Sequence, residues 1–247
     1  MNQSLSRKYA NILATDLDGT LVGDDFACDN LLSWMRSELR DFGLVYITGR
    51  HLDSVRDLIN ERSLPWPDLL VSDVGAQIYV GAALQIDMTW QQMMTEDWQP
   101  ERIRQIAANI NGLKQQSLPN DSRVSFYSDG SAPAEQLRSS LLAEGLGFTY
   151  IFSSDRDLDI LPAGGGKGEA LKYIVANYAA EGANILASGD SGNDSSMLTA
   201  GYPGVIVANA KPDLLQLEES SILYRAEHSY AAGILEGWQH FYGQRKQ

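Results

Sequence analysis

The sequence has little of three things, and each scarcity excludes a class of protein. Cys28 is the only cysteine in 247 residues, so no internal disulfide can form, and a lone cysteine is more often a small buried hydrophobe than a nucleophile. Lys and Arg number 19 against 32 Asp and Glu, and this net charge of −13 argues against a nucleic-acid partner. No apolar run reaches the length of a membrane span or of a leader segment. These features predict a soluble, unprocessed, cytoplasmic protein without a membrane partner.

The rest of the composition is that of a folded chain. Hydrophobic residues make up 44% of the sequence, which is enough for one large core or two modest ones. Short apolar stretches alternate with segments of helical period near both ends of the chain, a pattern typical of a parallel sheet with crossover helices. The predicted strands lie at 11–17, 43–48, 68–73, 184–190 and 204–209, and the predicted helices at 29–42, 52–63, 168–182, 194–201 and 231–243.

The middle of the chain has a different pattern of predicted helices and strands. Two predicted helices, 100–113 and 134–145, stand among predicted strands of antiparallel type at 122–128, 148–154 and 158–162. We therefore predict an α/β core of residues 1–85 and 163–247 that carries an inserted α+β module of residues 86–162.

Carboxylates gather where the core strands are expected to end. Asp16 and Asp18 in "ILATDLDGTL" are two residues apart, so on a strand they point to the same side and repel each other unless a cation or a shared proton intervenes. Thr48 ends the next predicted strand, and Asp190 ends a later one. Because ligands collect at the carboxyl ends of parallel strands, these residues are expected to face one crevice.

Two further stretches fit the same crevice. "GDSGNDSSM" adds Asn193 and Asp194 at a glycine-rich turn before a helix, although Asp is also a common helix cap. Such clustered oxygen ligands suit Mg²⁺. "PAGGGKGEAL" places Lys167 before another predicted helix, where its ammonium can reach a phosphate, although this turn alone is weak evidence.

These motifs carry a family resemblance. "DLDGT", "TGR", the isolated Lys167 and "GDSGND" occur in order and resemble the four motifs of the haloacid-dehalogenase superfamily of phosphohydrolases. "TEDWQPE", "LKQQS", "FSSDRDLDILP", "GVIVANAKPDLL" and "EHSYAAGILEGWQHF" resemble segments of bacterial sucrose-phosphate phosphatases. The resemblance implies a Rossmann-like parallel-sheet core and makes the inserted module a cap domain.

The resemblance also implies a role for each motif residue. Asp16 would be the nucleophile that forms an aspartyl-phosphate, and Asp18 the general acid and base. Mg²⁺ would be held by Asp16, the Asp18 carbonyl and Asp190, with Asp194 supporting this metal shell. The phosphoryl oxygens would be stabilised by Thr48, the Gly49 N–H, Asn193 and Lys167.

The inserted module supplies the candidates for contact with a sugar. Arg123 and Ser125 alternate along a predicted strand and share one face. Carboxylates suit sugar hydroxyls, so the run "DRDLDILP" contributes Asp155, Asp157 and Asp159, with a solvated strand edge as the alternative interpretation. Arg50 is expected to cap a helix. His51, His228 and His240 have no ligand spacing and are expected at the surface or at helix caps.

The resemblance implies a phosphatase that hydrolyses a small sugar phosphate, first of all sucrose 6-phosphate, to the sugar and phosphate. Mannosylfructose phosphate and glucosylglycerol phosphate remain open as substrates, and so does a sugar phosphomutase. A phosphate sensor with a dead site is disfavoured because Asp18, Lys167 and Asp190 are intact, and a dehalogenase lacks a reason for Asp18. We expect a monomer, with a sugar-phosphate synthase of the same pathway as a candidate partner.

Overall fold

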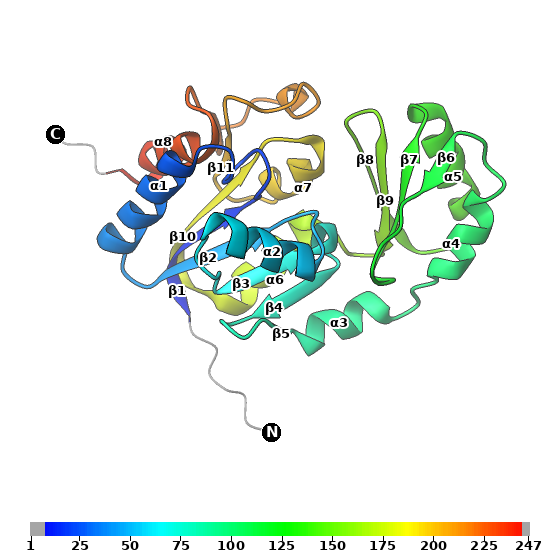
Figure 1. Cartoon of the computed structure of the whole chain (residues 1–247), viewed down its shortest axis with the longest axis horizontal. Helices are drawn as coiled ribbons and strands as arrows, with labels where there is room; N and C mark the ends of the chain where they lie inside the picture. The colour runs from blue at the N-terminus through cyan, green and yellow to red at the C-terminus, as the bar shows by residue number, and fades with distance from the viewer. Residues whose placement is uncertain (1–7, 244–247) are drawn as a thin grey trace.

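The computed structural model describes residues 8–243 and forms two sheets (Figure 1). The larger sheet has eight strands in the order β12-β11-β10-β1-β2-β3-β4-β5. Its six parallel strands are β1 (Tyr9–Thr15), β2 (Phe42–Ile47), β3 (Leu69–Ser72), β10 (Ala179–Gly189), β11 (Gly204–Ile206) and β12 (Leu223–Arg225). An antiparallel edge is added by β4 (Gln77–Val80) and β5 (Gln85–Ile86). The predicted parallel α/β fold is confirmed.

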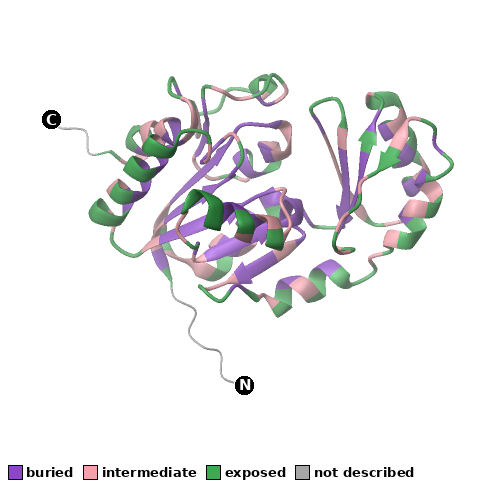
Figure 2. Cartoon of the chain, viewed as in Figure 1, coloured by how far each residue is buried: buried purple, intermediate pink, exposed green. Residues whose placement is uncertain are grey.

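Helices cover both faces of this sheet, so its strands are buried along most of their length (Figure 2). One hydrophobic cluster joins the sheet to α1 (Asp25–Glu38), α2 (Leu52–Arg62) and α8 (Tyr230–Tyr242). A second cluster, on the other face, includes α3 (Met88–Thr95), α6 (Lys167–Tyr178) and α7 (Ser195–Leu198). The result is a three-layer arrangement in which helices pack on both sides of the sheet.

Several helices begin or end elsewhere than the periodicity predicts, and contacts in the structure explain two of these boundaries. The first helix begins at Asp25, four residues earlier than expected, because the Asp24 carboxylate accepts a hydrogen bond from the Ala27 N–H and caps it. The helix predicted over 168–182 ends at Tyr178 instead. Ala179 is already extended and pairs with Tyr9, so the helix prediction is wrong over 179–182, which belongs to β10.

The second sheet belongs to a compact α+β unit, defined here as residues 100–162. Its antiparallel order is β6-β7-β9-β8, with β6 (Leu113–Gln115), β7 (Val124–Ser128), β8 (Phe148–Ser153) and β9 (Asp157–Pro162). The helices α4 (Pro100–Ala107) and α5 (Ser131–Ala143) pack on one face through their own hydrophobic cluster. On the opposite face, Ile151 and Leu161 pack against Val74 and Ala76, so this face is turned towards the large sheet.

Three smaller findings complete the fold. Helix α3 leads into the α+β unit, yet its Trp90 and Met94 are buried in the second cluster of the large sheet. Cys28 is buried and free, and burial together with nearby Asp29 raises the pKa of its thiol to about 12, as expected of a structural cysteine. Among residues 8–243, none of the helices has the length and apolarity needed to cross a bilayer.

Candidate active site

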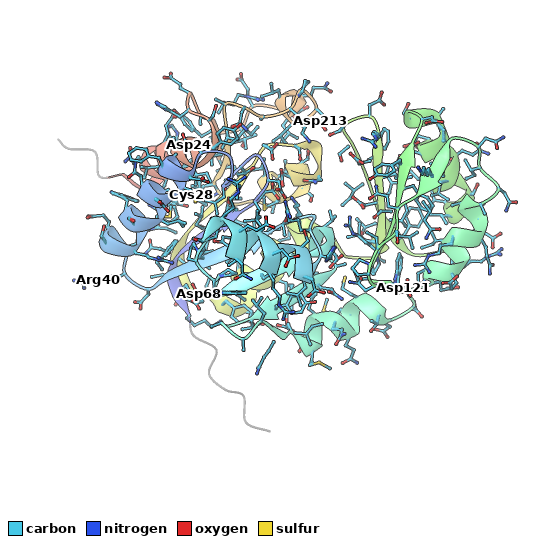
Figure 3. The ribbon with its side chains drawn as sticks, in the orientation of Figure 1. Asp24, Cys28, Arg40, Asp68, Asp121 and Asp213 are labelled. Atoms are coloured by element: carbon cyan, nitrogen blue, oxygen red, sulfur yellow. The ribbon has the colours of Figure 1, made fainter. Side chains whose placement is uncertain are left out.

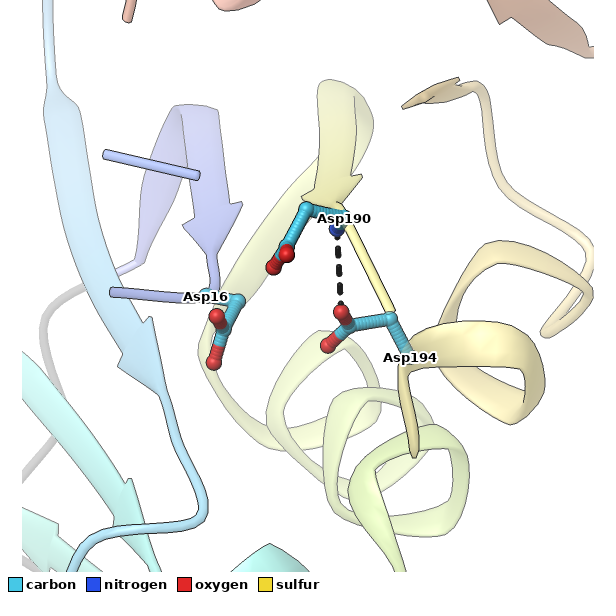
Figure 4. A group of neighbouring side chains, drawn as sticks. All are labelled: Asp16, Asp190 and Asp194. Carbon is cyan, nitrogen blue, oxygen red and sulfur yellow. Dashed lines mark hydrogen bonds between the residues drawn. The ribbon is translucent and has the colours of Figure 1, made fainter. Parts of the chain in front are cut away.

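Three carboxylates converge at the carboxyl ends of two neighbouring strands. Asp16 follows β1 and Asp190 follows β10, and because these strands are paired in register, the two residues emerge side by side. Asp194 reaches the same point from the short helical turn before α7 (Figure 4). One carboxylate oxygen from each residue lies within 4.8 Å of the others. All three residues are buried, so their charges need a cation or a shared proton.

Lys167 supplies one positive charge to this cluster. It is the first residue of α6 and is fully buried, with its Nζ 2.8 Å from Asp16 Oδ1 and 2.6 Å from Asp194 Oδ1. A buried ammonium needs such partners because desolvation penalises its charge. Both carboxylates oppose that penalty and raise the pKa of Lys167 above its ordinary value. Lys167 therefore stays charged beside Asp16.

The remaining oxygens of the cluster are placed by the loops around it. Asp194 Oδ2 accepts hydrogen bonds from the N–H groups of Asp190 and Ser191, at 3.1 and 3.0 Å. Thr20 Oγ1 donates to Asp190 Oδ1 at 3.0 Å. Gly19 has φ +81°, and an added Cβ there would lie 2.6 Å from Asp190 Oδ2. Glycine is required at this turn both for its backbone conformation and for the approach of Asp190.

Burial has the largest effect on the pKa values of Asp16 and Asp190. It raises the pKa of Asp16, against the opposing effect of Lys167, to about 7. Burial and the nearby charge of Asp194 raise the pKa of Asp190 to about 6. The 2.8 Å contact with Lys167 favours the ionised form of Asp16, and an additional cation would favour it further.

Asp18 lies outside this cluster and has a partner of its own. Its carboxylate accepts two hydrogen bonds from the Arg50 guanidinium, from Nε at 2.6 Å and from Nη2 at 2.8 Å. The prediction that Arg50 caps a helix is wrong, because His51 is the N-cap of α2 and accepts from the Ser54 N–H. The sequence signal for Arg50 was its place in "TGR", two residues after the polar Thr48 that follows β2.

The other predicted phosphate contacts lie beside the cluster. Thr48 is buried at the end of β2, and its Oγ1 accepts from the Arg50 N–H at 3.2 Å. Asn193 Nδ2 would lie 3.9 Å from a Cβ built on Gly49, so the loops that carry Asn193 and Gly49 approach each other. The structure thus brings Thr48, Gly49 and Asn193 to the same strand ends as the carboxylates.

Three of the predicted sugar contacts are bonded to one another. Arg123 Nη1 lies 2.6 Å from Asp159 Oδ1, and Ser125 Oγ donates to the same oxygen. Arg123 Nη2 also donates to the Gly49 carbonyl at 2.9 Å, which joins the α+β unit to the large sheet. Asp155 is exposed in the turn between β8 and β9, and Asp157 is half-buried at the start of β9.

Asp73 is a buried carboxylate that the sequence analysis missed. It directly follows β3, and its Oδ1 lies 3.7 Å from Arg123 Nε without accepting a hydrogen bond. Burial raises its pKa, and Arg123 opposes that rise. The rule that places functional groups at the carboxyl ends of parallel strands would have found Asp73, because "LLVSD" ends like the other core strands.

The donor set fits a divalent cation with oxygen preference. Asp16 Oδ2 and Asp190 Oδ2 lie outside the hydrogen bonds described above, whereas both oxygens of Asp194 are engaged. Carboxylates of this kind suit Mg²⁺, which binds through one or two of them and keeps several waters. The geometry thus offers Asp16 and Asp190 as ligands and Asp194 as their support.

A comparison with protein families decides the identity. Residues 9–242 match the model of the sucrose-6F-phosphate phosphohydrolase family. The chain belongs to this family. A solved family member, the sucrose-phosphatase of Synechocystis in complex with sucrose and phosphate, shares 34% identity with it. That comparison covers 94% of this chain and 98% of the other, with a TM-score of 0.86.

Proteins similar to this chain are named for different phosphorylated sugars. The mannosylfructose-phosphate phosphatase of Agrobacterium fabrum is 31% identical over 95% of this chain and 98% of its own length. The probable sucrose-phosphatase 2 of Arabidopsis thaliana is 33% identical, and the glucosylglycerol-phosphate synthase of Pseudomonas anguilliseptica 35%. This chain spans 59% and 30% of their lengths, respectively. A haloacid dehalogenase-like hydrolase from Bacillus subtilis, 19% identical with a TM-score of 0.66, shares the fold alone.

Proposed function

We propose that this chain is a Mg²⁺-dependent phosphatase that hydrolyses a phosphorylated sugar through an aspartyl-phosphate on Asp16. The observation that carries the proposal is the buried contact of Lys167 with Asp16 and Asp194, next to Asp190, in a member of a phosphohydrolase family. These four charged groups, two after core strands and two at the start of helical segments, have no packing role that apolar residues could not fill.

In the first step of the proposed reaction, Asp16 Oδ attacks phosphorus and the bond between phosphorus and the sugar oxygen breaks. Asp18 gives that oxygen a proton and then takes one from the water that cleaves the aspartyl-phosphate. Lys167, Thr48, the Gly49 N–H and Asn193 stabilise the phosphoryl charge. Asp16, the Asp18 carbonyl and Asp190 would hold Mg²⁺, whose positive charge would offset the repulsion between carboxylate and phosphate.

The pairing of Asp18 with Arg50 corresponds to the state of Asp18 after it has given its proton away. A carboxylate that accepts two hydrogen bonds from a guanidinium carries no proton to donate. Proton donation therefore requires Asp18 to leave Arg50 and turn towards the substrate. Its half-exposed side chain has room to do so, whereas Asp16 is held in place by Lys167.

We further propose that the α+β unit acts as a cap over this site. Its sheet turns the polar face with Arg123, Ser125 and Asp159 towards the core, and Arg123 contacts the Gly49 carbonyl. A cap in this position would exclude water and select the sugar. Asp155 and Asp157 remain the candidates for contact with sugar hydroxyls, because the other three polar groups are bonded among themselves.

Sucrose 6-phosphate is the first candidate substrate, supported by the family model and by the Synechocystis enzyme. Mannosylfructose phosphate is the second, because the Agrobacterium phosphatase matches over nearly its whole length. Glucosylglycerol phosphate is the third, and the synthase relative supports the proposal that a sugar-phosphate synthase is a partner of this chain.

One experiment separates these possibilities. Phosphate release from the three esters is measured with Mg²⁺ and with excess chelator, and the sugar product is examined for a transferred phosphoryl group. The proposal expects Mg²⁺-dependent release of free phosphate with one ester preferred. Phosphate moved to another hydroxyl would identify a mutase. Full activity in excess chelator would refute the proposed requirement for Mg²⁺.

A further inference from the structure

Asp213 joins the α+β unit to a loop of the candidate active site. Its Oδ2 accepts a hydrogen bond from the Gly192 N–H at 3.2 Å and another from the Ser154 N–H at 3.0 Å. Gly192 immediately precedes Asn193 and Asp194, whereas Ser154 lies in the turn between β8 and β9. Figure 3 labels Asp213 on the loop that faces this hairpin. One carboxylate oxygen thus spans both parts of the molecule.

The core side of this contact is anchored. The Lys211 N–H donates to the Asp190 carbonyl at 2.7 Å, and Leu214 is fully buried in the second cluster of the large sheet. Asp213 Oδ1 accepts from the Leu214 N–H at 3.0 Å, which orients the carboxylate. Asp213 is therefore held by the same segment that contacts the backbone of Asp190.

On the α+β unit, the turn between β8 and β9 presents a backbone amide to Asp213. Ser154 and Asp155 both have positive φ, +53° and +49°, and the Arg156 N–H closes the turn on the Ser153 carbonyl at 3.2 Å. Three residues, 154–156, thus lie between the paired Ser153 and Asp157, and the Ser154 N–H donates out of this turn to Asp213. The turn thus offers a donor to Asp213.

Gly192 makes the approach of Asp213 sterically feasible. A Cβ added there would lie 2.4 Å from Asp213 Oδ2 and 3.3 Å from the Ser153 Cβ. Any larger residue would push both groups away. Glycine at this position thus serves the contact between the two parts of the molecule.

From this geometry we infer that Asp213 is a positioning residue that couples closure of the α+β unit to the loop carrying Asn193 and Asp194. When the hairpin docks, one carboxylate fixes both the Ser154 and the Gly192 amides, so the closed form adds a restraint on Gly192 beside Asn193, whereas Asp194 is held by core groups in either form. The inference rests on the proposed cap function. It predicts that Asp213 affects substrates that need the closed form and spares those that react without it.

The test compares Asp213→Ala and Asp213→Asn with two controls. Ser154→Gly keeps the amide donor and suits the positive φ, and Glu219→Ala removes an exposed carboxylate of the same segment. Losing two hydrogen bonds to a charged group should lower kcat/KM for the preferred sugar phosphate about 10- to 100-fold in Asp213→Ala, with a smaller loss in Asp213→Asn. Hydrolysis of a small aryl phosphate should change by less than about threefold, and both controls should match the wild type.

Hydrogen exchange supplies a readout besides activity. The Ser154 and Gly192 amides should exchange about tenfold faster in Asp213→Ala than in the wild type, while amides of β1 stay unchanged. Equal losses on both substrates, or unchanged exchange at Ser154, would overturn the inference. A wild-type protein that hydrolyses none of the sugar phosphates would instead refute the proposed function, and the exchange result would still test Asp213.

Discussion

Removing the Asp159 carboxylate tests whether it serves the fold or the substrate. In the structure Asp159 neutralises Arg123 at 2.6 Å and accepts from Ser125, and the side chains of the pair are each only 10% exposed. Asp159→Ala leaves a buried guanidinium with the Gly49 carbonyl and the more distant Asp73 as its partners. Breaking a buried pair from one side costs about 3–5 kcal/mol, and these remaining partners favour the lower end, about 3 kcal/mol.

The assay is the free energy of unfolding in urea, measured beside kcat/KM for the sugar phosphate and for an aryl phosphate. Asp129→Ala, which removes an exposed carboxylate just after β7, is the matched control and should stay within about 0.5 kcal/mol of the wild type. A double-mutant cycle with Arg123→Met should give a coupling energy of at least about 2 kcal/mol. A loss of stability below about 1 kcal/mol, together with a selective loss on the sugar phosphate, would refute the reasoning and make Asp159 a sugar contact.

Three further predictions concern the core site. Asp18→Asn should lower kcat by about 10²- to 10⁴-fold because proton transfer is lost, and wild-type rates would remove Asp18 from that role. The raised pKa of Asp190, about 6 against 3.8, means that the folded state holds this proton more tightly than the unfolded state does. Without metal, the free energy of unfolding should therefore fall as the pH rises from 3.8 to about 6. The rise in Tm on adding Mg²⁺ should be larger at about pH 7.5 than at about pH 5. A pH-independent rise would contradict this. Gly19→Ala, which crowds Asp190 Oδ2, should raise the apparent Kd for Mg²⁺ at least about tenfold in a titration, and an unchanged Kd would place the metal elsewhere.

The sequence predicted the core arrangement because a general rule governs it. Parallel strands end at one edge, so the residues after β1 and β10 had to meet there, and the structure brings Asp16 and Asp190 together with Lys167. The same rule covers Asp73 after β3, which was overlooked. The end of α6 could not be read from periodicity, because the pairing of Ala179 with distant Tyr9 overrides its helical propensity.

The partners of the polar groups in the α+β unit were beyond sequence reasoning. Alternation placed Arg123 and Ser125 on one face, and in the structure both side chains reach the same Asp159 oxygen. That Ser125 stands opposite Asp159 depends on the register between β7 and β9, which is set by long-range packing. The contact of Arg123 with the Gly49 carbonyl depends on how the two sheets face each other. Because of these contacts, Arg123, Ser125 and Asp159 bind one another instead of being free to bind a ligand. No local sequence pattern predicts such contacts.

The central claim is that phosphoryl transfer passes through Asp16, and trapping the covalent intermediate tests it most directly. Asp18→Asn protein is mixed with the preferred sugar phosphate and Mg²⁺, quenched in acid within one turnover, and reduced with borohydride, which converts an aspartyl-phosphate to homoserine. The account predicts homoserine at position 16, found by peptide mass spectrometry, and none in a sample without substrate. Homoserine at another aspartate, or substrate consumed with residue 16 unmodified at every time point, would contradict it.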